Sequence, residues 1–275
     1  MQTVLDRIVA SKREEIAFAK KRRDLESLVE SAQQGPEIRS FLDALQGHDY
    51  VRLIAEVKRA SPSKGMIRPQ FYPVDIAKAY QAGGAAAISV LTDEPFFQGR
   101  LDYLTDIRQR VDLPLLRKDF ILDPYQVYEA RVAGADAVLL IAECLEGDSL
   151  VDLYNLIEGL GMTALIELYD PKHLDRVLAT GTKLVGINNR DLHTFSVDLE
   201  HVIRLRSHIP DDVVVVAESG IFTAADVHKI HAANIQAMLV GESLMRQTDI
   251  KQAVISLLQL PFGEGTSDST SGNDS

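Results

Sequence analysis

Eight apolar runs rich in β-branched residues recur along this 275-residue chain, and their regular spacing constrains the fold more than any other feature. Two of the runs, residues 137–141 and 213–217, are apolar at every position rather than at every second one. Such strands are buried on both faces, as in a parallel sheet covered by helices. The runs occupy residues 52–57, 86–91, 113–117, 136–141, 163–168, 183–187, 213–217 and 236–240.

Helical patterns with Pro, Asp or Thr start signals separate these runs, for example at residues 73–80 and 123–132. Eight strands that alternate with eight helices over about 200 residues have the size of a (β/α)8 barrel. We therefore predict an α/β fold, a (β/α)8 TIM barrel over residues 49–260. A doubly wound open sheet is the alternative, but eight regular units without a topological break favour closure.

The segments outside the barrel differ from it in composition. Residues 1–48 predict an N-terminal helical extension that packs on the barrel, with a long helix at 3–31 and a short one near 41–45. This extension could act as a lid, a plug on a barrel end or an oligomer contact. Residues 261–275 are polar and rich in Gly and Ser, which predicts a disordered tail.

Charge and composition narrow the function classes. The net charge of −11 argues against nucleic acid or an anionic membrane as partner. Cys144 is the only cysteine, so an intramolecular disulfide is impossible. No signal-peptide core is found in the first thirty residues, and no run approaches the roughly 18 apolar residues of a membrane span. We expect a soluble, cytoplasmic protein.

Cofactor motifs are missing from the sequence. The seven histidines do not pair with acids at ligand spacing near a strand end, so no metal site is expected. No Gly-x-Gly-x-x-Gly, P-loop or Gly-x-Ser-x-Gly pattern occurs, which disfavours dinucleotide, NTP and serine-hydrolase chemistry. We expect no cofactor.

Polar residues follow the predicted strands at their carboxyl ends, where a parallel barrel builds its active site. Glu56 and Lys58 are two residues apart and therefore share one side of the first strand. Three carboxylates and two lysines in a low-dielectric mouth can hold the shifted pKa values that acid–base catalysis needs. The polar residues at or just after the strand ends are Glu56, Lys58, Lys118, Glu167, Asn188, Arg190 and Glu218.

Glycine-containing turns follow the last two strands. Ser219-Gly220 and Gly241-Glu242 each precede a helix, and backbone N–H groups at such turns form the phosphate cradle common in barrels. Simpler explanations remain for single residues. Two routine tight turns, a rim ion pair of Lys118 with Asp119, and a barrel-layer ion pair of Glu167 are the alternatives.

Four sequence motifs resemble the indole-3-glycerol phosphate synthase family of tryptophan biosynthesis. They span residues 54–65, 116–121, 186–192 and 217–221, and the resemblance covers nearly the whole chain up to Leu260. It implies ring closure, with decarboxylation and dehydration, of 1-(2-carboxyphenylamino)-1-deoxyribulose 5-phosphate to indole-3-glycerol phosphate, carbon dioxide and water. It also implies that no metal or organic cofactor takes part.

The resemblance also implies roles for individual residues. Lys118 would be the general acid for ring closure, and Glu167 the base for the dehydration. Glu56 and Asn188 would arrange hydroxyls and the anilino group, completing a catalytic set with Lys58. The remaining roles fall on substrate-binding Ser61, Phe120, Arg190 and Glu218, and on phosphate-binding Ser219, Gly220, Gly241 and Glu242.

Some assignments stay open at this point. Lys58 could meet the carboxylate or the phosphate, and could share acid duty with Lys118. Glu242 stands where many relatives carry a small residue, so only its backbone N–H is expected to bind phosphate. A sugar-phosphate isomerase barrel fits poorly, because Cys144 follows the fourth strand rather than the first. A non-catalytic binder would be favoured only if Lys118 or Glu167 were replaced. We expect a monomer or a weak homodimer.

Overall fold

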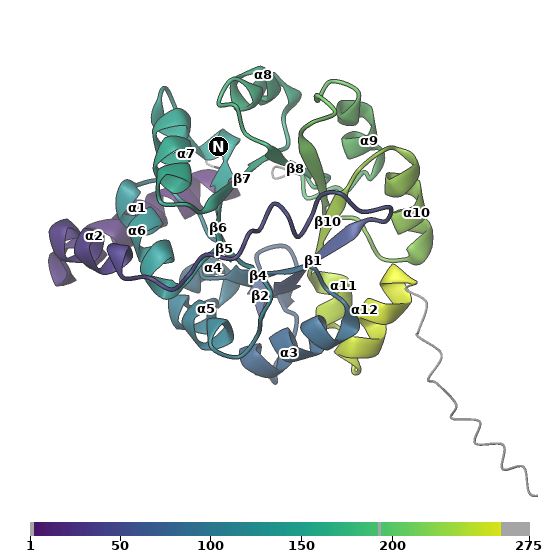
Figure 1. The fold of residues 1–275 in the computed structure, drawn as a ribbon, viewed down its shortest axis with the longest axis horizontal. Coiled ribbons are helices and arrows are strands. Elements are labelled where there is room, and N and C mark those ends of the chain that lie inside the picture. The colour runs from purple at the N-terminus through teal and green to yellow at the C-terminus, as the bar shows by residue number, and fades with distance from the viewer. Residues whose placement is uncertain (1–2, 192–193, 260–275) are drawn as a thin grey trace, which may run out of the picture.

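The computed structural model describes residues 3–191 and 194–259, and within them eight parallel strands close into a barrel (Figure 1). The barrel closes because the first strand pairs with both the second and the last, with Ile54 beside Ala87 and Arg52 beside Ala237. The predicted (β/α)8 barrel is confirmed, and the open-sheet alternative is wrong. The barrel strands are β1 (Arg52–Val57), β4 (Ala87–Leu91), β5 (Leu115–Lys118), β6 (Ala137–Ile141), β7 (Thr163–Leu168), β8 (Leu184–Asn188), β9 (Val214–Glu218) and β10 (Ala237–Val240).

Helices surround the strands on the outside of the barrel (Figure 1). Local capping explains where many of them begin and end: the Asp123 carboxylate accepts from Tyr125 N at one start. Gly84 and Gly134 close the preceding helices at φ 96° and φ 90°, values that favour glycine. The helices are α3 (Pro73–Gly83), α4 (Glu94–Phe97), α5 (Leu101–Arg108), α6 (Pro124–Ala133), α7 (Ser149–Gly159), α8 (Leu174–Leu178), α9 (Glu200–Arg206), α10 (Ala224–Ala232), α11 (Glu242–Met245) and α12 (Ile250–Leu258), with 3-10 turns at Ala142–Cys144 and Pro171–His173.

The strands are buried on both faces, which explains the continuous apolar runs. Leu53 and Val57 of β1 belong to the core under the helices, whereas Ile54 belongs to the core inside the barrel. Alternate side chains therefore fill two separate cores. The same alternation directs Glu56 and Lys58 inward at the open end of β1.

The N-terminal extension forms two helices rather than one. Helix α1 (Val4–Arg22) ends at the extended residue Arg23, and α2 (Leu25–Gln33) starts from Asp24, whose carboxylate accepts from Ser27 N. The prediction of one helix over residues 3–31 is wrong here, because a strong N-cap residue ends one helix and begins another.

The segment between α2 and β1 covers one end of the barrel. In Figure 1 it crosses the barrel on its way to β1. The short helix predicted near 41–45 is wrong, since these residues form turns. Phe41 and Leu45 are nevertheless fully buried against the inner core of the strands. They act as a plug at the amino ends of the strands.

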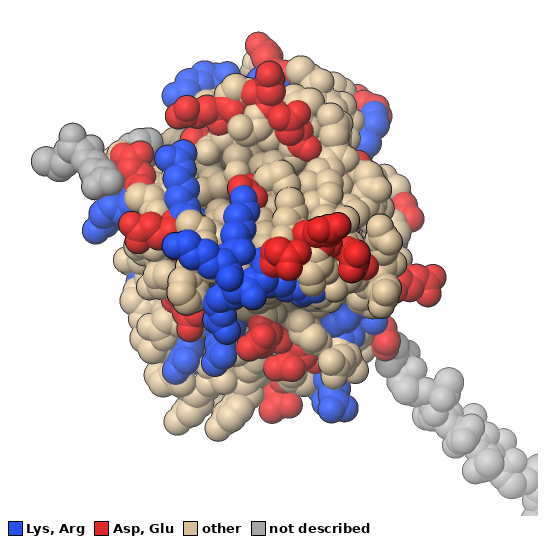
Figure 2. Space-filling model, turned by 90° about the vertical axis from the view of Figure 1, so that its left-hand side faces the viewer, with Lys and Arg blue, Asp and Glu red and all other residues tan. Residues whose placement is uncertain are grey.

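Further contacts join the extension to the barrel wall. Lys20 lies 2.7 Å from Asp123, and the Tyr125 hydroxyl donates to Ala19 O at 3.1 Å. Lys and Arg side chains gather in a stripe on the side of the molecule that carries α1 and α2 (Figure 2). Basic charge is thus concentrated locally in an acidic protein. The predicted tail at 261–275 lies outside the described residues.

Two smaller features complete the fold. The loop after β1 forms a two-stranded hairpin of β2 (Ala60–Ser61) and β3 (Gly65–Met66), which carries Ser61 beside the barrel mouth. Among the described residues, the helices are too short or too polar to cross a lipid bilayer.

Candidate active site

One cavity opens at the carboxyl ends of the strands, and every site residue predicted from the sequence lines it. These residues come from six of the eight barrel strands or the loops that follow them, so side chains far apart in the sequence meet in one place. The lining includes Glu56, Lys58, Ser61, Lys118, Phe120, Glu167, Asn188, Arg190, Glu218, Ser219, Gly220, Gly241 and Glu242.

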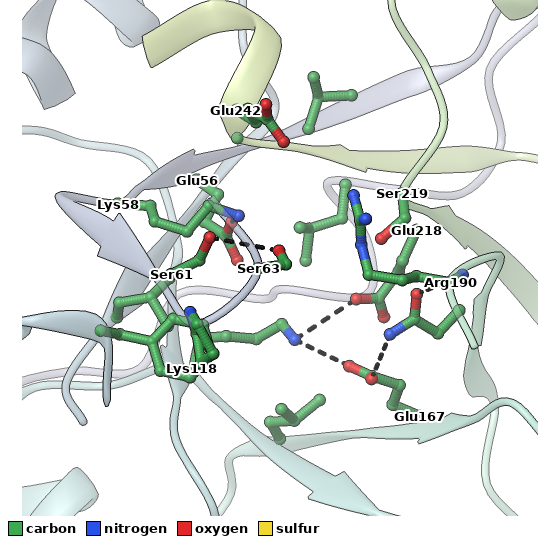
Figure 3. A pocket seen from close by; sticks show the side chains of 18 of the residues that line it. Glu56, Lys58, Ser61, Ser63, Lys118, Glu167, Arg190, Glu218, Ser219 and Glu242 are labelled. Atoms are coloured by element: carbon green, nitrogen blue, oxygen red, sulfur yellow. Dashed lines mark hydrogen bonds and ion pairs between the residues drawn. The ribbon is translucent and has the colours of Figure 1, made fainter. Parts of the chain in front are cut away.

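Lys118 lies at the centre of the polar side of this cavity (Figure 3). As the last residue of β5 it points inward, and only 14% of its side chain is exposed. Its Nζ lies 2.8 Å from Glu167 Oε2 and 3.5 Å from Glu218 Oε2. The ammonium therefore bridges carboxylates from β7 and β9.

Burial and charged neighbours shift the pKa values of Lys118, Glu167 and Glu218 in different directions. Burial alone lowers the pKa of Lys118, but Glu167, Glu218 and Glu56 together outweigh burial and raise it. Burial also raises the pKa of Glu167, yet Lys118 and Asn188 hold it below its usual range. Burial and then the neighbouring Glu167 raise the pKa of Glu218 well above that of an ordinary glutamate. The surroundings thus favour a charged Lys118 and an ionised Glu167, and they disfavour ionisation of Glu218.

Two further contacts orient the carboxylates. Asn188 Nδ2 donates to Glu167 Oε1 at 3.0 Å, which leaves Oε2 for Lys118. Lys58 Nζ lies 2.5 Å from Glu56 Oε2, as expected for neighbours on one face of a strand. Each glutamate of the site therefore enters the cavity with at least one oxygen already held.

Glycine makes room for two of these glutamates. A Cβ atom on Gly186 of β8 would overlap Glu218 Oε1, and one on Gly241 would overlap Glu56 Oε2. Gly186 was not among the site residues predicted from the sequence. Its signal was a glycine inside an apolar strand, which often marks a close approach by another group.

The turns after β9 and β10 form the remaining polar wall. Ser219 and Gly220 both adopt positive φ, 66° and 82°, which turns the chain sharply towards α10. Glu242 directs its carboxylate towards Arg246 Nε at 3.2 Å and Lys64 Nζ at 3.8 Å. Its charge is thus partly balanced by the loop after β1 and by its own helix.

The apolar wall contains residues that the sequence did not predict for the site. Val4, Leu5 and Ile8 bring α1 to the cavity, and Phe97 faces Phe120 with ring centroids 6.1 Å apart. The helical spacing of the α1 residues was visible in the sequence, but nothing in it indicated which surface they would meet. Together Val4, Leu5, Ile8, Phe97 and Phe120 line an apolar part of the cavity, which we call the aromatic slot.

Metal-binding residues are not grouped in the part of the chain that the structure describes: it holds no cluster of three or more His, Cys, Asp or Glu side chains that could ligate an ion.

A closed parallel barrel with a buried lysine, glutamates and glycine turns at its open end is the arrangement of a (β/α)8-barrel enzyme. Residues 5–257 match the family model described as "Indole-3-glycerol phosphate synthase". The chain belongs to this family, and it is therefore a carboxy-lyase of tryptophan biosynthesis.

Curated relatives agree with the family model. A protein of Rhodopirellula baltica named indole-3-glycerol phosphate synthase is 59% identical over 256 residues, which is 93% of this chain and 99% of the relative. A protein of the same name from Polaromonas sp. is 48% identical over 263 residues, covering 94% of this chain and 100% of its own.

Solved structures support the fold at lower similarity. A 3-hexulose-6-phosphate synthase superposes with a TM-score of 0.62 at 14% identity, over 76% of this chain and 99% of that one. An N-acetylmannosamine-6-phosphate 2-epimerase from Clostridium perfringens gives a TM-score of 0.60 at 18% identity, over 80% and 96%. At this identity the likeness concerns the barrel alone.

Proposed function

We propose that this cavity closes the indole ring of 1-(2-carboxyphenylamino)-1-deoxyribulose 5-phosphate and releases carbon dioxide and water. The observation that carries the proposal is the Lys118–Glu167 pair, 2.8 Å apart at the open end of the barrel. It puts a proton donor and a proton acceptor within reach of one bound molecule. Membership of the family supports the choice of substrate.

Ring closure is assigned to Lys118. The aromatic carbon that bears the carboxylate attacks the ketone carbon, and the ketone oxygen takes a proton from the Lys118 ammonium. Because negative charge develops on that oxygen, a buried ammonium stabilises the transition state as well as supplying the proton. Carbon dioxide then leaves from the attacking carbon, and its bonding electrons restore the aromatic ring. The raised pKa of Lys118 ensures that the ammonium is charged beforehand.

Dehydration is assigned to Glu167. The hydroxyl formed in the first step takes a proton from the Lys58 ammonium and leaves as water, pushed out by the anilino nitrogen, and Glu167 removes a proton from the adjacent carbon. Its lowered pKa keeps Glu167 ionised and able to accept that proton. The bond from Asn188 at 3.0 Å fixes the plane of the carboxylate during this step.

A proton on Glu218, which its raised pKa favours, would balance the charge of the cluster. Three glutamates and two lysines converge here, namely Glu56, Glu167, Glu218, Lys58 and Lys118. With one proton on Glu218, two negative and two positive charges remain. A cluster whose charges balance costs less to bury than one that carries a net charge.

The remaining wall residues would hold the two ends of the substrate. Arg190 and Lys58 provide cations for its anionic groups, and the turns at Ser219-Gly220 and Gly241 provide backbone N–H groups for the phosphate. Phe120 and the apolar residues of α1 would contact the aromatic ring. Anchoring both ends folds the flexible sugar chain over the ring, which is an orientation effect.

Indole fluorescence after mixing the protein with the carboxyphenylamino-deoxyribulose phosphate tests the proposal. The chain contains no tryptophan, so product emission appears on a dark background. We expect a rise in emission without added metal or nucleotide, and a rise slower by about 10²- to 10⁴-fold with Lys118→Ala. Folded protein that binds the compound without any rise would exclude catalysis and leave a binding function.

A further inference from the structure

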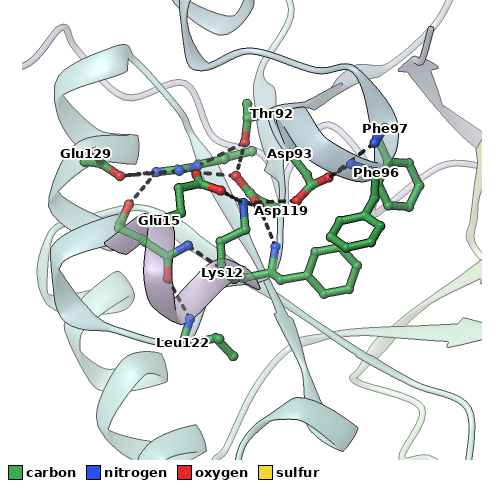
Figure 4. A network of polar contacts seen from close by, with 12 residues as sticks. Lys12, Glu15, Thr92, Asp93, Phe96, Phe97, Asp119, Leu122 and Glu129 are labelled. Carbon is green, nitrogen blue, oxygen red and sulfur yellow. Dashed lines mark hydrogen bonds and ion pairs between the residues drawn. The ribbon is translucent and has the colours of Figure 1, made fainter. Parts of the chain in front are cut away.

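Helix α1 carries a buried lysine, Lys12, which contacts two loops of the barrel. Only 1% of the Lys12 side chain is accessible, although the residue belongs to a run of charges on a surface helix. Its Nζ lies 2.9 Å from Asp119, 3.1 Å from Asp93 and 2.8 Å from Glu15 (Figure 4). Asp93 and Asp119 are themselves almost fully buried, so two loops of the barrel share this one ammonium.

Each of the two aspartates is tied to a wall of the active-site cavity. Asp119 lies between Lys118 and Phe120, and its Oδ1 also accepts from Phe120 N at 2.8 Å. Asp93 caps the short helix α4 by accepting from Phe96 N at 2.9 Å and Phe97 N at 3.2 Å. The ammonium therefore joins the backbone that carries Phe120 to the backbone that carries Phe97.

The third wall comes from the same helix as the lysine. Ile8 lies four residues before Lys12, which is one turn of helix, and it lines the cavity. The contact of Lys12 thus fixes the position of α1 along the barrel mouth, and with it the apolar residues that α1 contributes. The Lys12 ammonium therefore links the three elements that line the aromatic slot, namely α1, α4 and the end of β5.

Asp93 depends on Lys12 for its counter-charge more than Asp119 does. Asp119 has a second cation, since Arg117 Nη2 lies 3.3 Å from its Oδ2, whereas within the described residues Lys12 is the one cation that makes an ion pair with Asp93. A buried carboxylate without a cation is unfavourable, so removal of Lys12 would drive Asp93 towards solvent. The α4 turn and Phe97 would move with it.

We propose that Lys12 is a positioning residue for the reaction. It sets the spacing of the aromatic slot by holding α1, Phe97 and Phe120 together, and through Asp119 it steadies the neighbouring Lys118. The inference rests on the proposed function only in taking the slot as the place for the aromatic ring of the substrate. Lys12 itself does not line the cavity.

The first test compares Lys12→Met with Lys20→Met. Both lysines lie on α1 and pair with an aspartate of a barrel loop, but Lys20 is exposed and its partner Asp123 does not line the cavity. For Lys12→Met we expect KM to rise by about 10- to 100-fold with a smaller change in kcat, because a displaced slot weakens binding and orientation. Lys20→Met should stay within about twofold of the wild type. A KM of Lys12→Met within twofold of the wild type would overturn the proposal.

A second pair of variants separates positioning from general instability. Asp93→Asn keeps the helix cap, since asparagine caps as well as aspartate, but removes the charge that Lys12 neutralises. Alone, Asp93→Asn should raise KM. In the double variant with Lys12→Met, KM should be no higher than in the poorer single variant, because the charges balance again. If the two effects instead multiply, the ion pair does not act as a unit and the proposal fails. If Lys12→Met does not fold, an unchanged KM for Asp93→Asn has the same meaning.

Binding measured without turnover distinguishes this inference from the proposed function. In the Lys118→Ala background, the dissociation constant of the carboxyphenylamino-deoxyribulose phosphate should rise when Lys12→Met is added and stay constant when Lys20→Met is added. A wild-type protein that makes no product would refute the proposed function alone. An active wild type in which Lys12→Met leaves this dissociation constant unchanged would refute the role of Lys12 alone.

Discussion

The Nζ atom of Lys118 lies 2.8 Å from Oε2 of Glu167, so the proposed acid and the proposed base contact each other in the cavity. A substrate that uses both groups must pass between them and replace this ion pair with its own ketone oxygen and C–H bond. The pair keeps the lysine protonated and the glutamate ionised until the substrate is bound. Part of the binding energy of the substrate is thus used to separate them.

Lys118→Ala should lower kcat by about 10²- to 10⁴-fold and leave KM within a few-fold of the wild type. The reason is that the ammonium acts mainly on charge that develops in the transition state. Steady-state indole fluorescence measures both constants. A large rise in KM with an unchanged kcat would show that Lys118 binds the ground state instead.

Glu218→Gln should flatten the alkaline side of the pH–rate profile. The pKa of Glu218 is raised, so the wild type keeps its proton at higher pH than an ordinary glutamate and loses activity as pH rises through that pKa. Glutamine carries no ionisable proton and resembles the protonated acid, so this fall should disappear. The control is Glu218→Ala, which should be impaired at every pH. If the fall in activity at high pH persists in Glu218→Gln, another ionisable group causes it.

Gly186→Ala should reduce activity by about tenfold or more while the barrel still folds. The added methyl group would overlap Glu218 Oε1, and this displaces the carboxyl from Lys118. Gly159→Ala is the matched control, because its Cβ would meet nothing within 4 Å and it lies in a helix. It should keep full activity and gain up to about 1 kcal/mol of stability. Equal activity of the two variants would show that Glu218 tolerates displacement.

Glu242→Ser should lower KM by about two- to fivefold at low salt. The carboxylate lies beside the turn proposed for the phosphate, and its pairing with Lys64 and Arg246 withdraws two cations from an anionic ligand. The gain should shrink at 1 M salt, where screening is nearly complete. Glu242→Gln, which keeps the size of the side chain, should show the same effect. A rise in KM for both variants would mean that the carboxylate helps to close the loop after β1.

Strand positions could be predicted closely because burial on both faces leaves an unbroken apolar signal. Strand β7 has the predicted bounds 163–168, while β5 starts at Leu115 instead of residue 113. Pro114 explains this shift, since proline lacks the N–H that strand pairing needs. The position of polar residues at the strand ends then followed from the barrel itself, which is why the predicted site residues share one cavity.

The sequence could not predict contacts that depend on how the extension docks. Lys12 is followed by Arg13, Glu14 and Glu15, a pattern typical of a solvated helix face. Its burial results from Asp93 and Asp119, two residues far along the chain whose neighbourhood only the closed barrel creates. Gly186 was missed for a similar reason, because the side chain that fills its space belongs to the next strand.

The plug formed by Phe41 and Leu45 has a consequence for biosynthesis. These residues leave the ribosome before any strand, yet the inner core against which they pack includes Leu139 of β6 and Val216 of β9. The part of the chain that is made first therefore reaches its final place only after most of the barrel has been translated. Until then these apolar side chains lack the core against which they pack in the folded protein, and transiently exposed apolar surface of this kind makes folding intermediates prone to aggregation.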